Sequence, residues 1–157
     1  LRLFHSGPDG PYGSFRNVDS ALAAEGKALG FAMNAGMYHR DLAPVGLYVE
    51  NGIETSALVT REGPGNFGLL PNGVFCIGDR FRVIESRAFE AERPDCRFAT
   101  QSGPMLVIKG ALHPQLLPGS DSLNIRNGVG VSEDGLRAVF AISNDEVNFN
   151  TFARLFR

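Results

Sequence analysis

Four turn signals, each set between short apolar runs, constrain the fold of this chain more than any other feature of its sequence. They lie at Asn51-Gly52, Gly78-Asp79, Lys109-Gly110 and Glu133-Asp134-Gly135. Asparagine and glycine tolerate the backbone angles that tight hairpins require, and Asn-Gly is the strongest local hairpin signal. We therefore expect β-hairpins within residues 44–60, 73–85, 105–113 and 122–143.

Further strands are expected outside these hairpins. The chain contains 19 glycines and 12 phenylalanines, which favour a β-rich fold with tight turns. Leu1 to Phe4 and the start of residues 31–38 are predicted as strands, with a loop rich in Gly and Pro over residues 5–14. Met105 to Ile108 is predicted as a buried strand that begins directly after the polar residues 100–102.

Two stretches carry the three- and four-residue spacing of an amphipathic helix, residues 17–27 and the tail 147–157. The apolar positions are Val18, Leu22 and Ala23 in the first stretch and Phe149, Phe152, Ala153 and Phe156 in the second. The candidate N-caps are Asn17 or Asp19 for the first and Asn144 or Asp145 for the second. A short helix, then hairpins, then a C-terminal helix predict an α+β fold with a mostly antiparallel sheet.

Composition bounds the classes of function. A length of 157 residues fits a single domain, and a net charge of −2 gives no reason to expect nucleic acid or an anionic membrane as partner. No apolar run approaches the roughly 20 residues that cross a bilayer. Cys76 and Cys96 are too few for a zinc site; they could pair in an oxidising compartment or serve as small core residues, and the second is favoured.

No common catalytic or cofactor signature is present. The sequence contains no phosphate-binding P-loop, no dinucleotide-binding glycine pattern, and no G-x-S-x-G around Ser102. The three histidines, His5, His39 and His113, lie far apart without an H-E-x-x-H pattern, so we expect solvated loop histidines and no metal site. Nothing in the sequence requires a cofactor.

The notable pattern is a set of polar residues that interrupt or end apolar runs. These are Asn34, Thr100, Gln101, Ser102, Arg126, Asn127, Ser143, Asn144 and Asn148. Each has a structural interpretation: Asn34 with Gly36 fits a bulge, and Arg126 could pair with Glu133, Asp134 or Asp145. Together they suggest a site for an anionic or sugar-bearing small ligand, because an Arg fork suits phosphate and neutral amides suit sugar hydroxyls.

Several of these residues also carry a resemblance to a known family. It extends over residues 31–52, 63–75, 99–110, 125–132 and 147–157. Together these stretches resemble bacterial members of the phosphodiester glycosidase family, a branch often labelled exopolysaccharide-biosynthesis-like. The family includes the animal lysosomal uncovering enzyme, which removes N-acetylglucosamine from a phosphodiester on mannose.

The resemblance implies roles for individual residues. Asn34 would line the site, because residues 33–36 match an Asn-Gly-Gly-Phe-type motif, and Arg126 matches the arginine of an Arg-x-x-x-Gly segment. We take Arg126 and Asn34 as candidate catalytic residues, with Arg126 holding the phosphate and stabilising charge on the leaving group. The candidate substrate-binding residues are Gln101, Ser102, Gly103, Asn127, Gly130 and Ser143.

The family's last motif, a Leu-Asp-Gly-Gly-like stretch, has no counterpart in residues 1–157. Its aspartate is a candidate for acid–base work, since glycoside cleavage normally uses carboxylates. We therefore expect residues 1–157 to form a single phosphodiester glycosidase-like domain that lacks this motif and part of its first strand.

Three functions compete at this stage. The first is a hydrolase that cleaves a sugar 1-phosphodiester in cell-surface or exopolysaccharide glycan. The second is a non-catalytic glycan- or phosphate-binding module of the same fold, and the third is a different hydrolase on the same scaffold. The resemblance implies a glycan partner and an exported protein, while the sugar, any metal requirement and the oligomeric state stay open.

Overall fold

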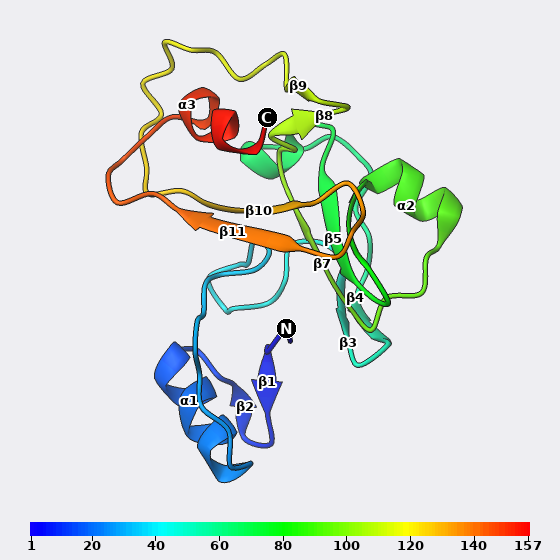
Figure 1. The fold of residues 1–157 in the computed structure, drawn as a ribbon, viewed down its shortest axis with the longest axis vertical. Coiled ribbons are helices and arrows are strands. Elements are labelled where there is room, and N and C mark those ends of the chain that lie inside the picture. The colour runs from blue at the N-terminus through cyan, green and yellow to red at the C-terminus, as the bar shows by residue number, and fades with distance from the viewer.

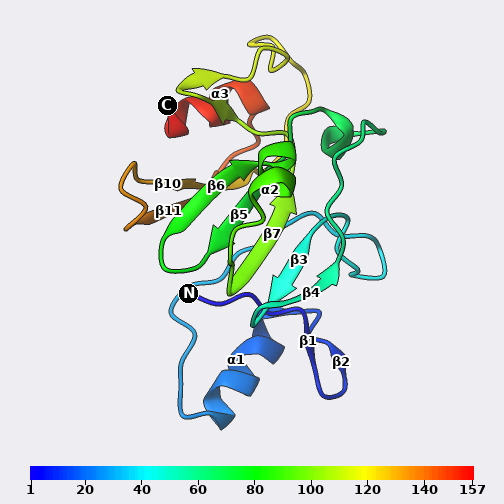
Figure 2. The ribbon, with the colours of Figure 1, turned by 90° about the vertical axis from the view of Figure 1, so that its right-hand side faces the viewer.

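A five-stranded antiparallel sheet forms the centre of the molecule in the computed structural model, which describes all residues 1–157. The strands follow the order β4-β3-β7-β5-β6 (Figure 2). Their bounds are β3 Tyr48–Glu50, β4 Ile53–Ser56, β5 Gly73–Ile77, β6 Phe81–Glu85 and β7 Phe98–Ser102. Because β7 pairs with both β3 and β5, it joins two hairpins into one sheet.

All four predicted hairpins are present. Asn51 and Gly52 both have positive φ, at 53° and 79°, and Lys109 and Gly110 repeat the pattern at 50° and 80°. Lys109-Gly110 joins the short strands β8 (Val107–Ile108) and β9 (Ala111–Leu112). The fourth turn joins β10 (Asn127–Val131) to β11 (Ala138–Ile142). The prediction of an α+β fold with mostly antiparallel strands is confirmed.

Both predicted helices form, but other residues cap them. Helix α1 spans Phe15–Ala24 with Ser14 as N-cap, and α3 spans Phe149–Ala153 with Asn148 as N-cap, followed by the 3-10 turn η2 (Arg154–Phe156). The predicted caps Asn17, Asp19, Asn144 and Asp145 are therefore wrong. The Ser14 side chain accepts from the Asn17 backbone N–H, and the Asn148 side chain accepts from the Thr151 backbone N–H. Each N-cap thus lies three residues before the N–H that it bonds.

Other predicted elements differ from the structure. Leu1–Phe4 and residues 31–37 form no strand, because neither segment has a pairing partner beyond the bridge of Tyr38 with Pro44. The Gly- and Pro-rich loop instead holds a minimal hairpin, β1 (Ser6–Gly7) and β2 (Gly10–Pro11). Helix α2 (Ser86–Glu92) and the 3-10 turn η1 (Asn66–Gly68) were not predicted.

The expected strand at Met105–Ile108 is also wrong in extent. Only its last residues belong to β8, and the segment is half-buried. The long buried strand is β7, which runs through Thr100 and Gln101 and ends at Ser102. The polar residues are thus part of a central strand, where the Gln101 side chain finds hydrogen-bonding partners inside the core.

Each face of the sheet packs against a different layer (Figures 1 and 2). One face contributes Leu47, Val74 and Ala99 to a core that includes Ala88 and Phe89 of α2. The other face contributes core residues that pack against the β10–β11 ribbon. These are Tyr48, Phe75, Ile77 and Phe98, and Leu3 of the N-terminal segment joins the same core. Glycines 128 and 130 leave room for Phe152 and Phe156, which pack on the ribbon.

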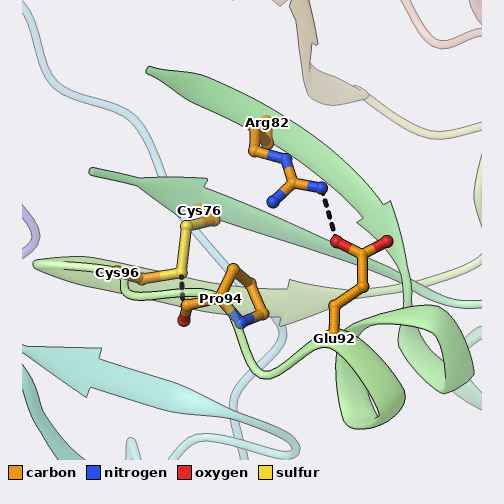
Figure 3. The surroundings of a disulfide bond; sticks show 5 residues. All are labelled: Cys76, Arg82, Glu92, Pro94 and Cys96. Carbon is orange, nitrogen blue, oxygen red and sulfur yellow. Dashed lines mark hydrogen bonds and ion pairs between the residues drawn. A yellow bond between two sulfur atoms is a disulfide. The ribbon is translucent and has the colours of Figure 1, made fainter. Parts of the chain in front are cut away.

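The two cysteines are core residues and also form a disulfide. Cys76 and Cys96 are 2% and 6% exposed and are joined by an S–S bond of 2.03 Å (Figure 3). The preference for unpaired core cysteines is therefore corrected: sequence separation alone could not reveal that β5 and the approach to β7 lie side by side. The bond closes a loop over a separation of 20 residues that contains β6 and α2, for which loop closure predicts about 3 kcal/mol of stabilisation.

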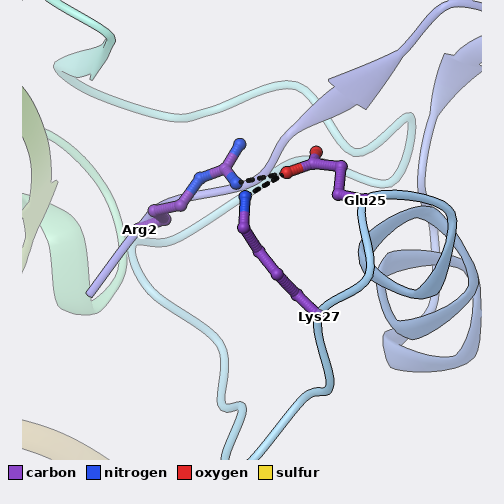
Figure 4. A network of polar contacts seen from close by, with 3 residues as sticks. All are labelled: Arg2, Glu25 and Lys27. Carbon is purple, nitrogen blue, oxygen red and sulfur yellow. Dashed lines mark hydrogen bonds and ion pairs between the residues drawn. The ribbon is translucent and has the colours of Figure 1, made fainter.

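The N-terminal residues lie to one side of the sheet, where α1, β1 and β2 project from the body (Figure 1). Glu25, just after α1, accepts from Lys27 at 2.5 Å and from Arg2 at 3.3 Å (Figure 4). These exposed ion pairs contribute little to stability. Among the helices, none combines the length and apolar character that a bilayer span requires.

Candidate functional site

Three of the predicted site residues meet at a small pocket on the surface, which we call the asparagine pocket. Its volume is about 270 Å³. It is lined by Asn34, Ala35, Gly36, Met37, Tyr38, Ser102 and Asn127. Asn34 belongs to the irregular segment 31–38, Ser102 ends β7, and Asn127 begins β10, so the pocket joins three separate parts of the fold.

Close backbone contacts fix the walls of this pocket. A β-carbon on Gly36 would collide with Thr100 Oγ1 and would lie 2.6 Å from the carbonyl oxygen of Gln101. Only glycine therefore allows segment 34–38 to lie this close to β7. On the opposite wall, Asn127 Nδ2 donates to the carbonyl oxygen of Asn34 at 2.8 Å, which ties β10 to the same segment.

The side chains that line the asparagine pocket retain hydrogen-bonding capacity. Asn34 and Ser102 are exposed, and their side chains make no hydrogen bond within the protein. Asn127 uses one donor for Asn34 and leaves its side-chain oxygen free. The pocket thus presents two carboxamides and a hydroxyl, which can donate to and accept from hydroxyl groups and phosphate oxygens. No charged side chain belongs to its lining.

A larger, mainly apolar cleft of about 520 Å³ adjoins the asparagine pocket and shares residues 34–38 with it. Residues 1–5 and 11–15 form one side of the cleft, and Phe75 and Phe140 contribute from the body. Tyr48 also lines it, with its hydroxyl donating to Glu50 Oε2 at 2.9 Å. Burial, followed by the nearby Glu50 carboxylate, raises the pKa of Tyr48 well above its usual range, so the phenol stays protonated.

Arg126 does not line the asparagine pocket, although it directly precedes Asn127. Its guanidinium donates from Nε to Val147 O at 3.3 Å and from Nη2 to Ser122 O at 2.9 Å. It also lies over the ring of Phe149, 3.7 Å from the ring centre. Burial lowers the pKa of Arg126. The proposed ion pair with Glu133, Asp134 or Asp145 is absent, because no carboxylate lies within salt-bridge distance of this residue.

Two other predicted binding residues support the Arg126 region rather than the pocket. Ser143 Oγ accepts from the Arg126 backbone N–H at 2.8 Å, and the Ser143 N–H donates to Arg126 O at the same distance. Gly130 faces Phe156, since a β-carbon there would lie 2.8 Å from the Phe156 ring. Both residues therefore hold β10, β11 and the C-terminal helix together.

Gln101 and Gly103 lie behind the pocket wall. Gln101 is 1% exposed, and its carboxamide is hydrogen-bonded inside the core. Gly103 packs against the side chain of buried Asn72, whose Cγ would lie 2.6 Å from a β-carbon at position 103. Sequence reasoning missed Asn72 because Asn72-Gly73 is typical of a turn, whereas here the asparagine is fully buried before β5.

The histidines correct one expectation. His113 is 2% exposed rather than solvated, with Nε2 3.0 Å from Leu70 O and Nδ1 accepting from the Gln115 N–H. A neutral ring satisfies both contacts, with the proton on Nε2. His5 Nε2 lies 3.1 Å from Leu42 O. No group of three His, Cys, Asp or Glu side chains comes close enough to hold a metal ion.

Comparison with known proteins places this geometry in context. A family model described as "Phosphodiester glycosidase" matches residues 28–157, which include every residue that lines the asparagine pocket. An Escherichia coli (strain K12) protein, described as "Uncharacterized protein YigE", is 44% identical over 123 residues, which cover 78% of this chain. They cover 48% of that protein, so the chain spans about half the length of this curated relative. No solved structure matches the chain.

Proposed function

Because the chain belongs to the phosphodiester glycosidase family, we propose that it supplies the substrate-binding part of a hydrolase that cleaves a sugar 1-phosphodiester. The observation that carries this proposal is the asparagine pocket, in which Asn34, Ser102 and Asn127 present unused polar groups at one place. These groups match the chemistry of the ligand: sugar hydroxyls both donate and accept, and phosphodiester oxygens accept from amide and hydroxyl donors.

Neutral donors suit a phosphodiester in particular. A diester carries one negative charge spread over its free oxygens, so it can be held by several hydrogen bonds without a paired cation. Asn34 and Asn127 would donate from their carboxamides, and Ser102 from its hydroxyl. In this assignment Arg126 acts through the fold: it fixes the backbone from which Asn127 projects and does not contact the substrate.

A second candidate function is a non-catalytic module that binds the same ligand. It is favoured by one observation, that neither the asparagine pocket nor the adjoining apolar cleft contains an aspartate or glutamate in its lining. Glycosidases normally cleave with a pair of carboxylates. Saturable binding of a sugar phosphodiester without turnover would identify this function.

We also propose that the protein acts on cell-surface glycan and is exported. The Cys76–Cys96 disulfide supports an oxidising compartment, because disulfides seldom persist in the cytosol. A glycan of the cell surface or an exopolysaccharide is the natural source of sugar phosphodiesters in such a compartment.

Hydrolysis and binding of a methyl phosphodiester of N-acetylglucosamine 1-phosphate test the proposal, with a plain aryl phosphodiester as comparison substrate. We expect the sugar ester to bind and to be cleaved in preference to the aryl ester, and Asn34→Ala to lower both. The matched control is Asn144→Ala, an exposed asparagine outside the pocket lining. Preference for the aryl ester would identify a different hydrolase, and binding without cleavage would leave the binding module.

A further inference from the structure

A buried polar network lies directly behind the wall of the asparagine pocket, with Gln101 at its centre. Gln101 Oε1 accepts from the backbone N–H of Leu47 at 3.1 Å and of Val59 at 3.0 Å. Its Nε2 donates to Val59 O at 2.6 Å and to Ser86 Oγ at 2.8 Å. Both acceptor sites and both donors of the carboxamide are therefore occupied, which is its full hydrogen-bonding capacity.

The network continues from Gln101 to Ser86, which begins α2, and from there to Asn72, which directly precedes β5. Ser86 Oγ, which accepts from Gln101, donates in turn to Asn72 O at 3.0 Å, and the Ser86 N–H donates to the same carbonyl. The Asn72 side chain donates from Nδ2 to Phe67 O at 2.7 Å. Asn72 and Ser86 are 0% and 1% exposed, so no solvent competes for these bonds.

The network touches the pocket wall at two places. Gln101 lies between Thr100 and Ser102, and Gly36 packs against its carbonyl oxygen as well as against Thr100 Oγ1. At the other end, the Asn72 carboxamide packs against Gly103, the residue after Ser102. The backbone on both sides of Ser102 is therefore held from behind, by groups that do not reach the pocket itself.

From this geometry we propose that Gln101, with Ser86 and Asn72, is a positioning unit for the asparagine pocket: it fixes the Ser102 wall against segment 34–38 and does not contact the ligand. This replaces the substrate-binding role expected for the Gln101 side chain. As a statement about catalysis it rests on the proposed function. As a statement about the pocket wall it stands on the hydrogen bonds alone.

The identity of the side chain matters because the site demands donors and acceptors together. Glutamate would present a carboxylate to Val59 O and Ser86 Oγ and would bury a charge without a partner, which costs far more than a lost hydrogen bond. Methionine keeps the length and volume of the side chain but leaves two backbone N–H groups and one carbonyl without their partner. Gln101→Met therefore removes the network with little change in packing.

The test compares Gln101→Met with the substitution of a similarly buried residue at the other end of β7. Phe98→Leu is the matched control, because Phe98 is 2% exposed but belongs to the apolar core and to no part of the network. Amide hydrogen exchange is measured residue by residue on the whole chain. Each lost hydrogen bond lowers the free energy of local opening of the backbone. We therefore expect the amide exchange rates of Leu47, Val59 and Ser102 to rise about tenfold more in Gln101→Met than in Phe98→Leu.

Two further measurements keep the outcome decisive. If Gln101→Met does not fold, Ser86→Ala removes the bonds of Ser86 Oγ with Gln101 and Asn72 while leaving the Gln101 contacts with Leu47 and Val59. Exchange at Ser102 should then rise, with a smaller rise at Leu47 and Val59. In protein that cleaves the methyl phosphodiester, Gln101→Met should lower kcat about tenfold to hundredfold, with a smaller change in KM, because the wall that orients the substrate is displaced.

The results separate the two claims. Exchange that rises equally over the whole sheet in Gln101→Met and Phe98→Leu would overturn the positioning role, as would unchanged exchange at Ser102. An absence of turnover in the unmodified chain would count against the proposed hydrolase, yet the exchange result would still decide the inference about the pocket wall.

Discussion

The asparagine pocket and the Arg126 region arise from the same sequence pattern, yet they differ in how their polar groups are used. At the pocket, the side chains of Asn34 and Ser102 have no partner in the protein. At the Arg126 region, the guanidinium is bound to backbone carbonyls and stacked on Phe149, and Ser143 is bound to the Arg126 backbone. The polar groups of the asparagine pocket are free to bond a ligand, whereas those of the Arg126 region are bonded within the fold.

The difference shows that a polar residue within an apolar stretch is a candidate for binding only when its partners are missing. A buried charged or amide group without a partner costs free energy, and in this fold backbone and side-chain groups satisfy Arg126 and Gln101. An exposed group has no such requirement, so its presence at a cavity is informative. The comparison predicts that changes at the Arg126 region lower stability, whereas changes at the pocket lower binding.

Arg126→Met should produce the largest effect. It leaves the carbonyls of Val147 and Ser122 without their charged donor and removes the stack on Phe149. We expect the free energy of unfolding to fall by about 3 kcal/mol, measured by urea denaturation. The control is Arg137→Met, an exposed arginine, which should change stability by less than about 0.5 kcal/mol. Unchanged stability together with lost binding would place Arg126 back in the site.

Gly103→Ala should have the next largest effect, because a β-carbon would meet the Asn72 side chain, which Phe67 O holds in place. Overpacking of this kind predicts a loss of about 2 kcal/mol in the free energy of unfolding. Gly119→Ala serves as control, since no atom lies within 4 Å of its added β-carbon. If Gly103→Ala were as stable as this control, the close approach behind the pocket wall would be absent in solution.

Asn34→Ala should separate binding from stability. Because the Asn34 side chain makes no hydrogen bond in the protein, its removal should change the free energy of unfolding by less than about 0.5 kcal/mol. Binding of the methyl phosphodiester of N-acetylglucosamine 1-phosphate should weaken about tenfold, as expected for one lost polar contact. Calorimetric titration measures this affinity, and equal affinities for Asn34→Ala and Asn144→Ala would remove Asn34 from the site.

Ser102→Ala should give the smallest effect. It removes one neutral hydroxyl from the pocket lining, and an exposed hydroxyl contributes less to ligand binding than a carboxamide with several polar atoms. We expect affinity to fall about threefold with stability unchanged, by the same titration and denaturation measurements. A stability loss as large as that of Arg126→Met would show that Ser102 belongs to the fold rather than to the site.

Local signals in the sequence were sufficient for the hairpins and for both predicted helices. In the turns at Asn51-Gly52 and Lys109-Gly110, the asparagine and both glycines readily adopt positive φ, so no distant contact is needed. The order of the central sheet could not be read in this way, because β7 pairs with strands far away in the sequence. The disulfide depends on that same pairing.

The residues of the proposed site could be predicted only in part from the sequence, for a similar reason. Sequence reasoning named Asn34, Ser102 and Asn127, which the structure brings together. It also named Arg126 and Gln101, whose polar groups are bonded within the protein. The sequence alone cannot distinguish such a group from one that is free to bind a ligand. Asn72 and Ser86 were missed, since their partners become visible only when the strands are assembled.

The most direct test is a ¹⁵N NMR titration of the chain with the methyl phosphodiester of N-acetylglucosamine 1-phosphate. It follows the side-chain amide resonances of Asn34 and Asn127, the backbone amide of Ser102 and the Nε resonance of Arg126. We expect saturable shifts at Asn34, Asn127 and Ser102, with the Arg126 resonance nearly unchanged. Shifts centred on Arg126, or no saturable shift at the asparagine pocket, would contradict it.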